Sequence, residues 1–84
     1  MNNPRITQRV KEIVADKVNS TYEEIDAKKD FRNDLGMESL DIIELVLDLQ
    51  RELKIFIPDQ KSEKWKTVQD AIDTINELKQ EKSY

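Results

Sequence analysis

The sequence has no cysteine and no histidine, and their absence removes several kinds of chemistry. Without cysteine there is no disulfide and no thiolate nucleophile, and without either residue the usual zinc ligand sets are missing. Ser-His and Cys-His catalysis and histidine general bases are excluded as well. Aspartates at residues 26, 30 and 34 do not make a calcium loop, because the alternating oxygens and the glycine that an EF-hand needs are absent. The sequence therefore predicts no metal site.

Turn-forming residues are also scarce, with one glycine and two prolines among 84 residues. A loop-rich β fold would need more of them, whereas 38% charged and 37% hydrophobic residues suit well-solvated amphipathic helices. This length makes one small domain over residues 1–84, with a single core and, by default, a monomeric state. No apolar run is long enough for a signal peptide or a bilayer span, so we expect a cytoplasmic protein.

Apolar residues recur at helical spacing in three stretches, at residues 4–19, 39–53 and 68–80. Asn3 is a good N-cap for the first helix, and Pro4 suits the first helical position. Thr67 and Asp70 resemble a capping box at the start of the last helix. The apolar stripe of the middle helix is wider than one contact surface requires, so part of it should stay exposed.

The connections between these helices differ in length. Residues 20–36 form a long polar connection that four apolar anchors should hold to the core: Tyr22, Ile25, Phe31 and Leu35. After Pro58, which bars helix at the residue before it, we expect a short helical piece at residues 62–66. The prediction is an all-α fold, a four-helix bundle with a long first loop and a short third helix.

Ser39 lies where the loop with the only glycine leads into the acidic middle helix. Backbone N–H groups and the positive end of the helix dipole favour an anion at such a place, so its hydroxyl can carry a phosphodiester. Taken alone, the same serine would serve as an ordinary N-cap. Residues 38–60 hold six acids and two bases, which accounts for the whole net charge of −4. This run is either a solvated helix face or a field that repels nucleic acid and attracts basic protein surfaces.

Several separate motifs match one family in order and spacing. The chain has DLGMESLD at residues 34–41, ELV at 44–46, IPD at 57–59 and TVQDAI at 67–72. Over residues 6–78 these motifs resemble the acyl carrier proteins of bacterial fatty-acid and related synthesis. In that family the serine of an Asp-Ser-Leu motif receives 4′-phosphopantetheine from a transferase, and the thiol of the arm holds acyl groups as thioesters. The resemblance implies that Ser39 is the attachment site.

The resemblance also implies a carrier that is not itself an enzyme and that meets a phosphopantetheinyl transferase, acyl-transfer enzymes and synthases. Its partner-facing residues would be Glu38, Asp41, Ile43, Glu44, Leu47 and Trp65. An acyl chain would lie between inner helix faces, among Leu45, Leu49, Ile57, Ala71 and Ile72. Each of these five residues is, taken singly, also an ordinary core residue.

Some positions depart from the family pattern. Glu38 stands where the family usually has aspartate, which keeps the charge but changes the reach. Gln50 and Arg51 stand where acids are frequent, so the docking face is less acidic and a specialised pathway is favoured. Trp65 replaces a smaller aliphatic residue, where it would narrow the pocket, anchor a partner or fill the core.

Two other functions use the same features. A peptidyl or aminoacyl carrier would use the same serine with a different cargo. A helical adaptor would keep the fold without modification, and Glu38 is its only hint in the sequence.

Overall fold

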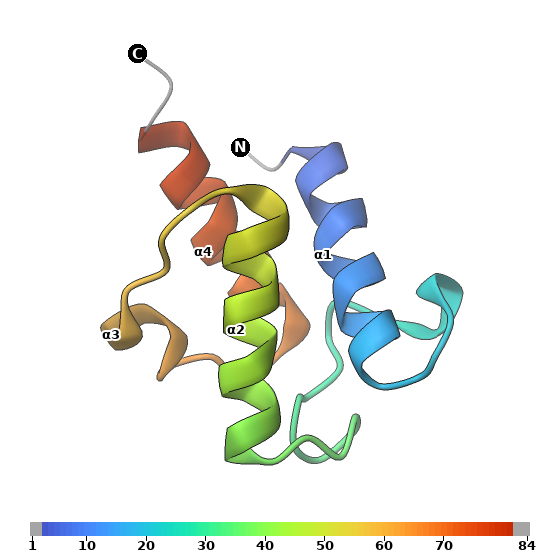
Figure 1. Ribbon diagram of the computed structural model, residues 1–84. Helices are drawn as coiled ribbons and strands as arrows, with labels where there is room; N and C mark the ends of the chain where they lie inside the picture. Colours follow the sequence, from blue (N-terminus) through green and yellow to red (C-terminus); the bar gives the residue numbers. More distant parts are fainter. Residues whose placement is uncertain (1–2, 82–84) are drawn as a thin grey trace.

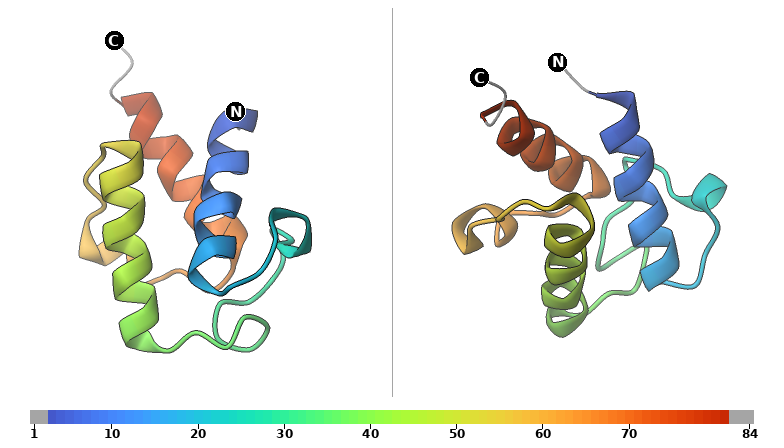
Figure 2. Two further views of the ribbon diagram at one scale, coloured as in Figure 1. Left: turned by 45° about the vertical axis from the view of Figure 1, so that its right-hand side comes forward. Right: turned by 45° about the horizontal axis from the view of Figure 1, so that its top comes forward.

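Three long helices pack around one core in the computed structural model, which describes residues 3–81 (Figure 1). The elements are α1 (Pro4–Lys17), the 3-10 turn η1 (Tyr22–Glu24), α2 (Ser39–Leu53), α3 (Asp59–Ser62) and α4 (Val68–Glu81). The predicted all-α bundle with a long first loop and a short third helix is confirmed. α1 begins and α4 ends at the end of the molecule opposite the start of α2 (Figure 2). None of the helices described is long and apolar enough to cross a membrane.

The ends of α1 follow from local backbone chemistry. Asn3 is the N-cap, as predicted, and its side chain accepts the Arg5 N–H at 2.9 Å. The predicted apolar stripe faces the core. The helix ends at Lys17, before the predicted residue 19, because Asn19 adopts the left-handed conformation with φ 58°. The Ser20 N–H then donates to the Ala15 carbonyl at 2.8 Å and closes the helix end.

The start of α4 has the predicted capping box. Asp70 Oδ2 accepts the Thr67 N–H at 3.0 Å, and Thr67 Oγ1 accepts the Asp70 N–H at 3.3 Å. Further along α4, Asn76 is buried at 6% exposure, but its polar atoms are satisfied. Its Oδ1 accepts the Asn3 N–H at 2.8 Å, and its Nδ2 donates to the Ile72 carbonyl at 2.9 Å. This side chain therefore ties α4 to the first turn of α1.

The third helix lies earlier than the predicted residues 62–66. Pro58 ends an extended segment with φ −61° and ψ 143°, and α3 begins at the next residue, Asp59. The Pro58 carbonyl accepts the N–H groups of Lys61 and Ser62 at 3.0 and 3.2 Å. The prediction used proline only as a helix stop, whereas here proline also starts the next helix. Residues 63–66 instead form turns and an extended stretch that lead to α4.

The long connection contacts the core through fewer anchors than predicted. Ile25 and Phe31 are buried, and Leu35 is partly buried against the core. Tyr22 was predicted as an anchor, but it is 39% exposed, and its ring centroid lies 5.8 Å from Lys11 Nζ. A tyrosine ring can contact a surface cation in this way. The prediction that Tyr22 anchors the connection to the core is therefore wrong.

Backbone hydrogen bonds join this connection to residues 66–69, where α4 begins. The Phe31 N–H donates to the Lys66 carbonyl at 2.9 Å, and the Val68 N–H donates to the Lys29 carbonyl at 3.0 Å. The Gln69 N–H adds a bond of 2.8 Å to the carbonyl of residue 27. The loop that leads to α2 is therefore held in place from outside, by a part of the chain far away in sequence.

A lysine occupies the left-handed position at the end of α2, which gives a first prediction. Lys54 is exposed and has φ 56° and ψ 50°, a conformation that costs a residue with a Cβ about 1–2 kcal/mol. Glycine adopts this conformation without that cost, but it loses more chain entropy on folding. We therefore expect Lys54→Gly to raise the free energy of unfolding by only about 0.5–1 kcal/mol. Urea denaturation with an unchanged slope would measure this gain.

The matched opposite change is Gly36→Ala, at φ 68°, where a new Cβ would meet nothing within 4 Å. Only backbone strain then counts, so the variant should lose about 1 kcal/mol. A loss of stability in Lys54→Gly would contradict the explanation for both positions.

Candidate functional site

Ser39 is the first residue of α2, and its side chain is exposed. The N-cap is Glu38, whose extended backbone places its carbonyl to accept the Ile42 N–H at 3.0 Å. Asp41 Oδ2 accepts the Glu38 N–H at 2.9 Å. The simple interpretation of Ser39 as an N-cap is therefore wrong, because the helix start is stabilised by Asp41 and the hydroxyl is not used for it.

The Ser39 hydroxyl has one partner that sequence reasoning missed. Arg32 Nη2 donates to Ser39 Oγ at 3.0 Å. Nothing in the sequence marks this arginine, because the contact depends on how the loop between the two residues turns. A guanidinium and the backbone N–H groups of a first helical turn are both donors that suit phosphate oxygens. The residues around Ser39 thus fit a phosphate group on its oxygen.

The loop before Ser39 is ordered by its own carboxylates. Asp30 Oδ1 accepts the backbone N–H groups of Arg32 and Asn33, each at 2.8 Å. The Asn33 N–H, together with that of Arg32, holds the pKa of Asp30 below its usual range. Asp34 Oδ2 accepts the Asp30 N–H at 2.7 Å. Within residues 3–81 no group of three or more carboxylates could hold a metal ion.

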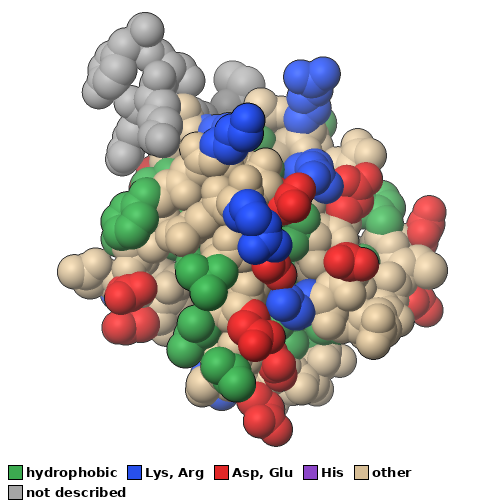
Figure 3. Space-filling view, in the orientation of Figure 1, with side chains coloured by type: hydrophobic (Ala, Val, Ile, Leu, Met, Phe, Trp, Pro, Cys, Tyr) green, Lys and Arg blue, Asp and Glu red, His purple; other side chains and the backbone are tan. Residues whose placement is uncertain are grey.

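α2 presents an exposed apolar row beside Ser39. Leu40, Ile43 and Leu47 are 65%, 57% and 54% exposed, at the spacing that places side chains on one helix face. Figure 3 shows hydrophobic side chains in a row over α2, with acidic side chains next to them. Ile43 and Leu47 were predicted to lie on the partner-facing surface, whereas Leu40 was not, although the same helical spacing identifies it. Phe56, at 71% exposure, was also missed.

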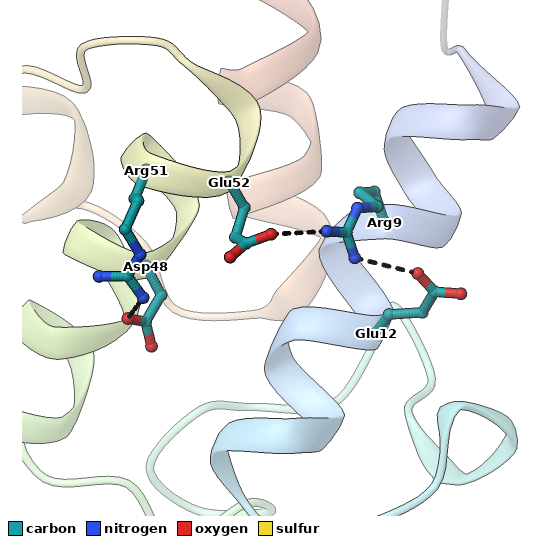
Figure 4. Close-up of polar contacts among 5 residues, drawn as sticks. All are labelled: Arg9, Glu12, Asp48, Arg51 and Glu52. Atoms are coloured by element: carbon teal, nitrogen blue, oxygen red, sulfur yellow. Dashed lines mark hydrogen bonds and ion pairs between the residues drawn. The ribbon is translucent and has the colours of Figure 1, made fainter.

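The acids in the second half of α2 are paired with bases. Arg9 of α1 donates to Glu52 at 2.7 Å, and Arg51 donates to Asp48 at 2.7 Å (Figure 4). Lys17 Nζ, at the end of α1, lies 2.9 Å from Asp48. The pairs made by Arg9 and Lys17 connect α1 to α2, and all three pairs neutralise part of the negative charge.

Acids closer to Ser39 keep more of their charge unpaired. Glu44 lies 3.7 Å from Lys17 Nζ and remains half exposed. Glu38 and Asp41 make no ion pair with the part of the chain that the structure describes. The negative field predicted for residues 38–60 is therefore concentrated at the start of α2.

The five residues expected to surround an acyl chain all lie in the core. Leu45, Leu49, Ala71 and Ile72 have no exposed surface, and Ile57 is 1% exposed. They belong to one continuous cluster of buried side chains, so the structure brings them together as core residues. Whether they also part for a cargo stays a prediction.

Trp65 does not offer the exposed anchor that one interpretation of the sequence required. It is 8% exposed, its Nε1 donates to Thr74 Oγ1 at 2.9 Å, and its ring centroid is 6.4 Å from that of Phe31. A tryptophan with its N–H satisfied and its ring against another ring fills the core. The role of Trp65 as a partner-binding residue is corrected accordingly.

Gln50 also has a structural role. Its Oε1 accepts the Ile57 N–H at 2.8 Å, and the side chain is half buried. The bond fixes the extended segment after α2, so Gln50 has a structural role besides any effect on docking.

Known proteins with similar sequences and folds form one group. Residues 8–75 match the family model described as a phosphopantetheine attachment site. The chain is 43% identical over 76 residues to an acyl carrier protein of Thermosynechococcus vestitus, covering 90% of this chain and 94% of that protein. It is 45% identical over 69 residues to an acyl carrier protein of Clostridium perfringens strain SM101, covering 82% and 91%. The crystal structure of an acyl carrier protein from Thermotoga maritima is similar with a TM-score of 0.76 at 28% identity, covering 92% and 89%.

The ion pair between Lys17 and Asp48 gives a prediction about pH. The hydrogen bond from Lys17 lowers the pKa of Asp48 from its usual value, and the same bond raises the pKa of Lys17. A carboxylate with a lowered pKa stabilises the fold above its unfolded pKa, and this stability is lost as pH falls through the folded pKa. We expect Asp48→Asn to lower the free energy of unfolding at neutral pH and to flatten its decline between about pH 5 and pH 2.

Chemical denaturation over that pH range would measure the effect. Glu23→Gln is the control, because Glu23 is exposed in η1 and makes no ion pair with the described residues. An Asp48→Asn variant with the same acid profile as the unaltered chain would show that the pair contributes nothing.

Proposed function

Because this chain belongs to the acyl carrier protein family, which carries acyl groups on 4′-phosphopantetheine, we propose that Ser39 Oγ is the point of attachment. The attached arm supplies a terminal thiol that holds the acyl group as a thioester, chemistry that a chain without cysteine lacks. The observation that carries the proposal is the position of Ser39: it is exposed on the first turn of α2, within the matched residues 8–75, and its hydroxyl does not cap the helix.

The residues around Ser39 have separate tasks in this proposal. Asp41 fixes the start of α2 through the Glu38 N–H, so the helix keeps its first turn without the serine. The free backbone N–H groups of that turn would face the phosphodiester. The acyl carrier names of the relatives favour an acyl cargo over an aminoacyl one, and the family's role as a carrier supports a protein that is not itself an enzyme.

The partner-facing surface in the proposal surrounds Ser39 on α2. Glu38, Asp41 and Glu44 supply negative charge for basic patches on a phosphopantetheinyl transferase and on acyl-handling enzymes. The exposed row that includes Ile43 and Leu47 supplies apolar contact. Such contacts are transient and sensitive to salt, which suits a carrier that must leave one enzyme to reach the next.

The acyl chain in the proposal enters between α2 and α4. It would lie against the buried Leu45, Leu49, Ile57, Ala71 and Ile72. Each methylene taken from water would contribute about 0.8 kcal/mol, which offsets the work of parting a packed core.

Ser39→Ala tests the attachment site. With a phosphopantetheinyl transferase, the unaltered chain should gain the mass of one 4′-phosphopantetheine, and Ser39→Ala should gain none. Because the hydroxyl caps nothing, the helical circular dichroism and the unfolding midpoint of the variant should stay nearly unchanged. Ser20→Ala, in the loop after α1, is the control and should still be modified. Modification of Ser39→Ala would place the arm elsewhere, and an unmodified natural chain would favour the helical adaptor.

The exposed apolar row of α2 is tested by replacing two of its side chains with alanine. Combined Ile43→Ala and Leu47→Ala should raise the KM for the transferase roughly tenfold, a loss of about 1.4 kcal/mol. The fold should remain, since both side chains are more than half exposed. Tyr22→Ala is the control, because it removes a partly exposed ring from η1, outside the proposed surface. An unchanged KM in the double variant would remove these residues from the docking surface.

A further inference from the structure

The guanidinium of Arg32 lies against the proposed attachment oxygen, in the loop before α2. We infer that Arg32 is a positioning residue that binds the phosphodiester on Ser39 and fixes the root of the arm beside the first turn of α2. This inference rests on the proposed attachment at Ser39, and its basis is the bond of 3.0 Å from Arg32 Nη2 to Ser39 Oγ.

The backbone of Arg32 is fixed before its side chain makes this contact. Its N–H donates to Asp30 Oδ1 at 2.8 Å. The residue before it, Phe31, is fully buried and donates its N–H to the Lys66 carbonyl at 2.9 Å. The Met37 N–H donates to the Phe31 carbonyl at 2.9 Å, which turns the chain back toward Ser39. The side chain therefore extends from a defined point, and less entropy is lost when it binds an anion.

The positive charge of Arg32 has no ion pair in the described structure. The other arginines near α2 do: Arg9 lies 2.7 Å from Glu52, and Arg51 lies 2.7 Å from Asp48. The Asn33 N–H lowers the pKa of Asp30 most, and Asp30 is close enough for the charge of Arg32 to help lower it. Its Oδ1 nevertheless accepts backbone N–H groups, and it makes no ion pair with the guanidinium. Two further carboxylates near Arg32 in the sequence also accept backbone N–H groups. Asp34 accepts the N–H of residue 30, and Asp41 accepts the N–H of residue 38.

A neutral hydroxyl is a weak partner for a guanidinium, whereas a phosphodiester at the same oxygen is a strong one. Arginine presents planar, parallel N–H donors that match two phosphate oxygens, and bonds between charged groups are roughly twice as strong as neutral ones. Attachment of the arm would thus supply Arg32 with an ion-pair partner, which it lacks in the described structure. Before attachment, Ser39 Oγ accepts from Arg32, so the hydroxyl keeps its own proton available to a base.

The test compares the chain before and after attachment of 4′-phosphopantetheine, in the natural form and in Arg32→Gln, Arg32→Lys and Arg5→Gln. Arg5→Gln is the control, since it removes the same group from an exposed site in α1. We expect attachment to raise the thermal midpoint of the natural chain and of Arg5→Gln by about 4 °C more than that of Arg32→Gln. Arg32→Lys should keep part of the gain, because it has the charge without the planar donors. At 1 M salt, where the Debye length is about 3 Å, the gain should shrink.

A second measurement needs no variant of Arg32. In the natural chain, the side-chain NMR signals of the Arg32 guanidinium should shift on attachment and exchange their protons more slowly, while those of Arg5 should not. Equal midpoint gains in the natural chain and in Arg32→Gln, or unchanged Arg32 signals in a chain that has gained the arm, would overturn the role of Arg32 alone. A natural chain that gains no mass with the transferase would overturn the attachment at Ser39 together with this inference.

Discussion

The position of Ser39 depends on backbone hydrogen bonds between the first connection and residues 66–69, where α4 begins. The Phe31 N–H bonds to the Lys66 carbonyl and the Val68 N–H to the Lys29 carbonyl. A connection as long as the one between α1 and α2 would otherwise have many conformations, and ordering it by local contacts alone would cost much entropy. Because these bonds run to a distant segment, the loop before Ser39 is held by the same element that completes the core. The position of the loop before Ser39 therefore depends on how α4 packs in the core.

Much of the fold could be predicted because it is encoded locally. The 3.6-residue period identified the buried stripes of α1 and α4, and the caps at Asn3 and Thr67 follow from side chains that bond to nearby backbone. The third helix was misplaced because one proline can both end and begin a helix, and the choice depends on the chain around it. The exposure of Tyr22 and the burial of Trp65 could not be predicted either. Both side chains combine a large apolar ring with a polar group, so either can lie in the core or at the surface. Which of the two occurs depends on the packing of the whole fold.

The candidate site divides in the same way. Ser39 was identifiable because its motif is contiguous and stands at a change from loop to helix, and the comparisons support that family. Arg32 was not, since its contact with Ser39 is set by turns that Asp30 and Gly36 stabilise. Leu40 could have been predicted, because it lies three residues before Ile43 and therefore on the same helix face. Its exposure of 65% shows that the wide apolar stripe of α2 has two faces.

These two faces give α2 separate structural and recognition surfaces. Leu45 and Leu49 are fully buried, whereas Leu40, Ile43 and Leu47 are more than half exposed on the same helix. The charges are divided along the helix as well. Asp48 and Glu52, in its second half, pair with α1, while Glu38 and Asp41 at its start make no ion pair in the described structure. A basic partner that approaches Ser39 would therefore meet unpaired acids and exposed apolar groups without breaking the ion pairs that Asp48 and Glu52 make with α1. Binding at the start of α2 then leaves the bundle intact, as a carrier that meets several enzymes in turn requires.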